Sequence, residues 1–181
     1  MNGDTTIRDA FRFVGALYRD ISRLIEELDE GFREFNYNDL LGPNCYFNSS
    51  ALPGEHKRWL PRVLTRVYVP GSERQGYTAF AFLNIYLTPQ QRREPVACWG
   101  VGRRIAGADL LYISQWSTRL LVPAGPTFVQ AGDVEPFRSG DEMQQVLDSF
   151  QYAVQPLLRL ESAAAVRLLV VDPIRRILEK P

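Results

Sequence analysis

Cysteine is scarce in this chain of 181 residues. The two cysteines, Cys45 and Cys98, lie far apart in the sequence and do not have the spacing of metal ligands. A chain of this size does not need a disulfide to fold, and two isolated thiols fit a reducing compartment. The N-terminus has an early acidic residue and lacks the apolar segment of a secretory signal. We therefore expect a cytoplasmic protein without a metal site.

The chain also lacks any excess of charge and any long apolar run. Lysine and arginine number 21, aspartate and glutamate also number 21, and the net charge is zero. A surface built to hold nucleic acid or an anionic membrane would be basic, so we expect neither as a partner. No apolar stretch approaches the ~20 residues that a bilayer-spanning helix needs. The length and the apolar content of 45% fit a single globular domain over residues 1–181.

The first third of the chain carries a helical pattern. Its apolar residues follow one another at alternating spacings of four and three, which places them on one seam of a helix. They are Ile7, Phe11, Val14, Tyr18, Ile21, Ile25, Leu28, Phe32 and Phe35. The sequence therefore predicts a long amphipathic helix that ends near residues 36–38. The stretch 36–57 is rich in Asn, Gly, Pro and Ser but contains scattered apolar residues, and it is expected to form an irregular, packed cover.

In the middle of the chain the apolar period changes to two. Alternating patterns predict strands at 62–69, 77–88 and 95–103, and short turns between three strands are typical of an antiparallel meander. The strand 77–88 is apolar on both faces, so it is expected to be central and covered on both sides. We expect one face to carry small and aliphatic side chains. The other face is expected to carry the aromatic residues Phe80, Phe82 and Tyr86, with Trp99 beside them.

The last third of the sequence predicts helices. Ser139 and Glu142 form a capping-box pattern before an apolar run that ends near Pro156, which predicts a helix there. Residues 163–171 fit either a helix or a strand, and a later Asp-Pro pair predicts a short final helix. Short apolar segments between 109 and 131 could add strands. Because helices and strands segregate along the chain, we expect an α+β fold with a long N-terminal helix, a mainly antiparallel sheet of about five strands and C-terminal helices.

The sequence contains no recognisable catalytic set. The single histidine, His56, has no neighbour that would orient its imidazole, so we expect a solvated surface residue. The run GVGRR at 100–104 is similar to a fragment of a phosphate-binding loop. It lacks the full glycine spacing and falls in a predicted strand, where glycine more often marks a close approach of other groups. The acidic residues within 133–142 form a polar turn, so the sequence indicates no catalytic residue and no cofactor.

Arginine offers the best candidate for a ligand site. In a meander, the first turn and the end of the third strand lie at the same edge of the sheet, which would bring Arg74, Arg103 and Arg104 together. Guanidinium groups can hold a phosphate or a carboxylate through paired hydrogen bonds, and Trp99 could add an aromatic surface. The alternative is that these arginines only keep the end of the sheet solvated.

The function that the sequence favours is non-enzymatic binding or assembly, as in an adaptor, a chaperone-like protein or an accessory subunit. The apolar seam of the first helix is roughly 42 Å long, which is more than the predicted sheet can cover. We favour a homodimer in which a second copy of the helix packs antiparallel about a two-fold axis, with Ile21 and Leu28 at the interface. The loop 36–57 is the alternative cover. A domain that binds a small anion or nucleotide and an enzyme of unrecognised type are the other functions left open.

Overall fold

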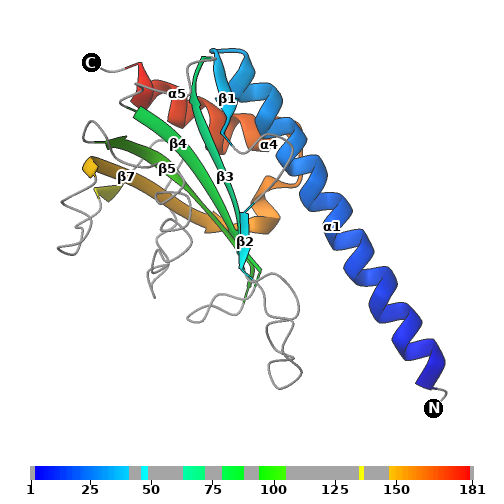
Figure 1. Cartoon of the computed structure of the whole chain (residues 1–181). Helices are drawn as coiled ribbons and strands as arrows, with labels where there is room; N and C mark the ends of the chain where they lie inside the picture. Colours follow the sequence, from blue (N-terminus) through cyan, green and yellow to red (C-terminus); the bar gives the residue numbers. More distant parts are fainter. Residues whose placement is uncertain are drawn as a thin grey trace.

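The computed structural model describes residues 3–40, 46–48, 63–71, 79–87, 94–104, 135–136 and 147–179. These residues form an α+β fold, as the sequence predicts (Figure 1). A long helix, α1 (Gly3–Arg33), precedes an antiparallel sheet, and further helices follow the sheet. The second half of α1 and the C-terminal helices share one hydrophobic core with a single face of the sheet. We call that face the helix face.

The sheet is antiparallel throughout its described part. Its longer strands are β3 (Val63–Pro70), β4 (Ala79–Tyr86), β5 (Val96–Arg104) and β7 (Leu147–Pro156), and its short strands are β1 (Tyr37–Asp39), β2 (Tyr46–Asn48) and β6 (Glu135–Pro136). The order is β1-β3-β4-β5-β7-β6, and β2 also pairs with β3. The predicted meander of β3, β4 and β5 is confirmed. β1 and β2 lie within the stretch 36–57, because the edge of β3 offers backbone partners that a local pattern cannot reveal.

Residues 147–156 form a strand where the sequence predicts a helix. β7 pairs with β5 along its whole length. The register points Tyr152 and Val154 to one face of the sheet and Ala153 to the helix face. Aromatic and β-branched residues at alternating positions suit a pleated, buried surface, and the backbone hydrogen bonds of β5 stabilise the extended form. The helical prediction is wrong because a tertiary partner outweighs the local spacing of apolar residues.

The register between β4 and β5 assigns their side chains to faces. Leu83 lies opposite Trp99, and both belong to the core on the helix face. Phe80 and Phe82 point to the other face, and both are fully buried. The prediction that β4 is central and buried on both faces is therefore confirmed. The expectation that Trp99 lies beside these phenylalanines is wrong, since the register aligns Trp99 with Leu83.

Two glycines of β5 make room for phenylalanine rings of β4. A Cβ atom on Gly102 would lie 2.3 Å from an atom of the Phe80 ring. One on Gly100 would lie 2.0 Å from the backbone carbonyl oxygen of Gln151 and 2.9 Å from the Phe82 ring. Neither position can take a Cβ atom unless these neighbours move, so glycine is required for the close approach. The run GVGRR is therefore part of a strand, and the structure provides no phosphate loop there.

We expect Gly102→Ala to lower the free energy of unfolding by about 1–3 kcal/mol, because the added methyl group would displace the buried Phe80 ring. Urea denaturation followed by circular dichroism measures this change. The matched control is Gly15→Ala on α1, where a Cβ atom meets nothing within 4 Å and helix propensity favours alanine by up to ~1 kcal/mol. A Gly102→Ala variant as stable as the wild type would contradict the close packing.

The chain after β7 forms a helical segment of changing pitch. A 3-10 helix, η2 (Leu157–Leu160), leads to α4 (Ala163–Val166), to the π-helical segment η3 (Arg167–Val171) and to α5 (Asp172–Leu178). Residues 163–171 are thus helical, and the predicted final helix is confirmed. Ser162 caps α4 by accepting a hydrogen bond from the Ala165 amide. Arg167 joins this segment to the turn that follows α1, because its guanidinium contacts both carboxylate oxygens of Glu34.

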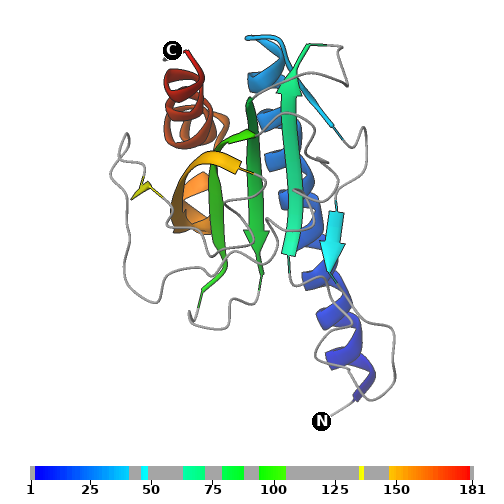
Figure 2. The same ribbon diagram turned by 60° about the vertical axis from the view of Figure 1, so that its left-hand side comes forward.

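Helix α1 is buried along its second half and exposed along its first. The buried apolar residues that it contributes to the core are Ile21, Leu24, Leu28 and Phe32. In contrast, Phe11 is 76% exposed and Phe13 is 70% exposed. The N-terminal half of α1 extends past the end of the sheet (Figure 1, Figure 2). The expectation that the sheet covers only part of the apolar seam is therefore confirmed.

Candidate protein-docking groove

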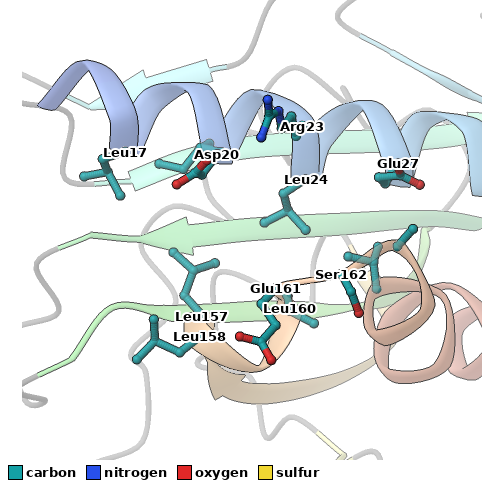
Figure 3. Close-up of a pocket in the computed structure, with 13 residues that line it drawn as sticks. Leu17, Asp20, Arg23, Leu24, Glu27, Leu157, Leu158, Leu160, Glu161 and Ser162 are labelled. Atoms are coloured by element: carbon teal, nitrogen blue, oxygen red, sulfur yellow. The ribbon is translucent and has the colours of Figure 1, made fainter. Parts of the chain in front are cut away.

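A groove separates α1 from the helical segment that follows β7 (Figure 3). Its volume is about 460 Å³. The wall on α1 consists of Leu17, Asp20, Ile21, Arg23, Leu24 and Glu27. The opposite wall includes Leu157, Leu158, Leu160, Glu161 and Val166. We call this cavity the α1–α4 groove.

The local sequence explains the shape of the wall opposite α1. β7 ends at Pro156, and the Leu157 amide then donates a hydrogen bond of 2.9 Å to the carbonyl of Pro95. This bond ties the start of η2 to the sheet. The single turn of η2 buries Leu160 but leaves Leu158 75% exposed. A large apolar side chain is therefore held at the mouth of the groove.

The floor of the groove is apolar. It is formed by the nearly buried side chains of Ile21, Leu24, Leu160 and Val166. Figure 3 shows the Leu24 side chain pointing from α1 toward the opposite wall. Leu17 and Leu157 are half-buried and lie closer to solvent. The hydrophobic core of the protein thus opens to the surface in this groove.

The apolar surface continues from the groove along the exposed half of α1. Phe13 stands four residues before Leu17, and Leu24 stands seven residues after it, so the three side chains lie on one row of the helix. Phe13 is one turn beyond the groove and is 70% exposed. The row and the leucines of the opposite wall form one apolar strip, which we call the docking surface. Its members are Phe13, Leu17, Leu24, Leu157 and Leu158.

Acidic residues predominate on the rim of the groove. Asp20, Glu27 and Glu161 are exposed and negatively charged, while Arg23 is exposed and positively charged. None of the three carboxylates forms an ion pair with another described residue. Three negative charges against one positive charge leave the rim with an excess of two negative charges at neutral pH.

The two residues predicted at a homodimer interface lie in the core of the single chain. Leu28 is 0% exposed and Ile21 is 4% exposed. One copy of the protein already buries both side chains, against the sheet and the C-terminal segment. The large apolar side chains that α1 leaves exposed in its described part are Phe11 and Phe13. A contact with a second copy along the seam would therefore use the N-terminal half of α1.

The predicted arginine cluster is only partly within the described residues. Arg103 pairs with the first residue of β4, so the end of β5 lies at the expected edge of the sheet. Arg74 and the side chain of Arg104 lie outside the described residues. Arg103 is half-buried, and its charge opposes the rise in the pKa of Tyr37 that burial causes. Trp99 is buried in the core on the helix face, so its ring does not present a surface to a ligand at this edge.

A buried ionic cluster joins α1 to the sheet. The guanidinium of Arg66 on β3 contacts the carboxylate of Asp29 on α1. The same guanidinium lies 3.2 Å from Asp39 of β1, measured from Nη1 to Oδ2. The hydroxyl of Tyr68 donates a hydrogen bond of 2.8 Å to Asp29. Since the Arg66 side chain is only 4% exposed, one buried positive charge ties three elements together.

Arg66 and Tyr68 of this cluster are not suited to proton transfer. Desolvation alone would lower the pKa of Arg66, but the nearby carboxylates outweigh it and raise that pKa. Burial, reinforced by Asp29, raises the pKa of Tyr68 well above its usual value. An acid–base catalyst needs a pKa near the working pH, whereas both groups keep their protons at neutral pH. The cluster therefore holds α1 in place. Its signal in the sequence is an arginine between Leu64 and Tyr68, on the inward face of a strand.

Other chemistry is limited within the part of the chain that the structure describes. Cys98 is a buried thiol of β5, and no group of three or more metal-ligating side chains occurs among the described residues. His56, Cys45, the segments between 109 and 131 and most of 133–142 lie outside them. No described helix is long and apolar enough to cross a membrane. The chain matches no known family model, and no characterised protein or solved structure is similar to it.

Proposed function

We propose that this protein is a non-enzymatic assembly protein that binds another protein through the docking surface. The observation that carries the proposal is the exposure of large apolar side chains beside one groove. Phe13, which extends one wall, is 70% exposed, and Leu158 on the other wall is 75% exposed. We place this binding in the reducing cytoplasm, in keeping with the scarcity of cysteine.

The physical reason lies in the arrangement of these side chains. Isolated exposed apolar residues are ordinary on protein surfaces, but a contiguous apolar strip with a polar rim is typical of an interaction site. Aromatic side chains such as Phe13 are frequent anchors of protein interfaces. Removing one such side chain from water contributes roughly 1.5–3 kcal/mol. A partner that covers Phe13 and Leu158 together would therefore bind with substantial affinity.

Cross-linking in cells that express the protein natively tests this proposal. We expect a photo-activatable residue in place of Phe13 to join the protein to one discrete partner, because this position borders the groove. The matched control carries the same residue in place of Glu26, which is exposed on α1 but does not line the groove. The control should give no such product. Mass spectrometry of the product identifies the partner.

Each outcome of this experiment decides a point. A product of two different chains supports assembly with another protein, and a product of two identical chains supports the homodimer. In either case, adding Leu158→Glu to the variant with the photo-activatable residue at position 13 should abolish the cross-linked product without changing the melting temperature, since the Leu158 side chain is exposed. A folded protein that gives no discrete product from position 13 would contradict the proposed function.

A further inference from the structure

We propose that the partner in the α1–α4 groove is an amphipathic helix of another protein whose apolar face is flanked by basic residues. This inference rests on the proposed function and names the chemistry of the partner. Three properties of the groove support it: its shape, its charge and the way in which charges are distributed around α1.

The shape of the groove suits a helix. Its two walls are themselves helical, and Phe13, Leu17 and Leu24 form a row along one wall at spacings of four and seven. Leu157 and Leu158 stand on the other wall. A helix that lies along such a row inserts apolar side chains at positions i, i+3 or i+4, and i+7. The exposed half of α1 beyond the groove lengthens this track by more than one helical turn (Figure 1).

The charge of the groove selects a basic partner. Asp20 and Glu27 border the groove on α1, and Glu161 borders it on the opposite wall. A helix lying between the walls would have carboxylates on both of its flanks. Lysine or arginine beside its apolar face would complement them, whereas acidic residues there would be repelled. Arg23 is the single basic residue of the lining.

The charge pattern around α1 argues against a second copy as the partner. Asp20 and Glu27, seven residues apart, lie in one row along the flank of α1 that borders the groove. Antiparallel helices related by a two-fold axis bring identical flanks together, so these carboxylates would face the same carboxylates of the second copy. Like charges facing each other oppose the antiparallel homodimer that the sequence suggested.

Two synthetic helical peptides test the inference. They share the same leucines at i, i+3, i+7 and i+10 and differ only in their flanking residues, which are lysine in one and glutamate in the other. Fluorescence anisotropy measures the binding of each to the full-length protein at low and high salt. We expect the lysine peptide to bind about ten-fold more tightly at low salt, and we expect salt to reduce this preference.

Charge reversal of the rim provides the decisive variant. In Asp20→Lys/Glu161→Lys the preference should invert toward the glutamate peptide, because both walls then carry positive charge. The matched control, Glu26→Lys/Glu30→Lys, changes the net charge equally at exposed positions of α1 outside the groove and should keep the preference for lysine. Circular dichroism verifies that all variants fold.

The results separate this inference from the proposed function. Three results would overturn the inference that the partner is a basic helix. Both peptides bind equally, neither peptide binds, or the control variant inverts the preference. If the Phe13 cross-link nevertheless joins a different protein, the assembly function stands without the basic helix. A cross-link that joins two copies of this chain also overturns the inference, since the partner would then be the chain itself. The inference is supported if Asp20→Lys/Glu161→Lys inverts the preference between the peptides and the control variant does not.

Discussion

Replacing Arg66 with methionine is expected to lower the free energy of unfolding by about 3–5 kcal/mol. The guanidinium of Arg66 lies between the carboxylates of Asp29 and Asp39, and its side chain is 4% exposed. Without it, the two carboxylates beneath α1 would lose the positive charge of Arg66 that offsets their desolvation. Equilibrium urea denaturation, followed by both circular dichroism and tryptophan fluorescence, measures the loss.

Two variants control for this effect. Arg167→Met removes an ion pair with Glu34 that is about half exposed, and it should lower the free energy of unfolding far less than Arg66→Met does. The variant Arg66→Met/Asp29→Leu/Asp39→Leu/Tyr68→Phe replaces the three charged side chains and removes the Tyr68 hydroxyl that bonds to Asp29, so it should recover much of the stability that Arg66→Met loses. An Arg66→Met protein as stable as the Arg167→Met protein would show that the cluster does not fasten α1 to the sheet.

Leu28→Ala is expected to destabilise the protein by about 2–5 kcal/mol, whereas Phe11→Ala should change the stability by less than about 0.5 kcal/mol. Both residues belong to the same apolar seam of α1. Leu28 is 0% exposed and lies in the core, while Phe11 is 76% exposed on the part of α1 that extends past the sheet. Thermal denaturation at low protein concentration compares the two variants directly.

The same pair of residues decides what a charged substitution does. Leu28→Asp should give an unfolded protein, because the carboxylate would be buried among apolar side chains. Phe11→Asp should fold as well as the wild type. The opposite result would show that a second copy covers the first half of α1 in solution. Phe11→Ala would then be as destabilising as Leu28→Ala, and the loss of stability that it causes would grow with protein concentration.

The elements with strong periodicity could be predicted from the sequence. The alternation of four and three residues gives α1, and the alternation of apolar residues with a period of two gives β3, β4 and β5. Such patterns are informative because each element has to bury one continuous surface. β7 could not be predicted in this way, because its apolar spacing fits both a helix and a strand, and the pairing with β5 decides between them.

The groove itself was not predicted from the sequence. The excess length of the seam correctly indicated that part of α1 lies outside the core, and that part carries Phe11 and Phe13. The sequence did not reveal that Leu157 and Leu158 would stand across from α1. These leucines are more than 130 residues from Leu17 in the chain, and no local pattern links positions so far apart. Ile21 and Leu28 were expected at an interface for the same reason. No local pattern shows that the C-terminal segment packs against α1 and helps to bury these two side chains.

What the sequence determined by itself is the set of local preferences: an α+β class, a long amphipathic helix and a meander with an apolar central strand. The tertiary structure alone decided which side chains meet. It brought Asp29, Asp39 and Arg66 together from three elements, and it aligned Trp99 with Leu83 rather than with the phenylalanines of β4. It also opened a groove between α1 and α4. Periodicity reports how one element faces its surroundings, whereas strand register and helix docking follow from the packing of distant segments, which a local pattern does not contain.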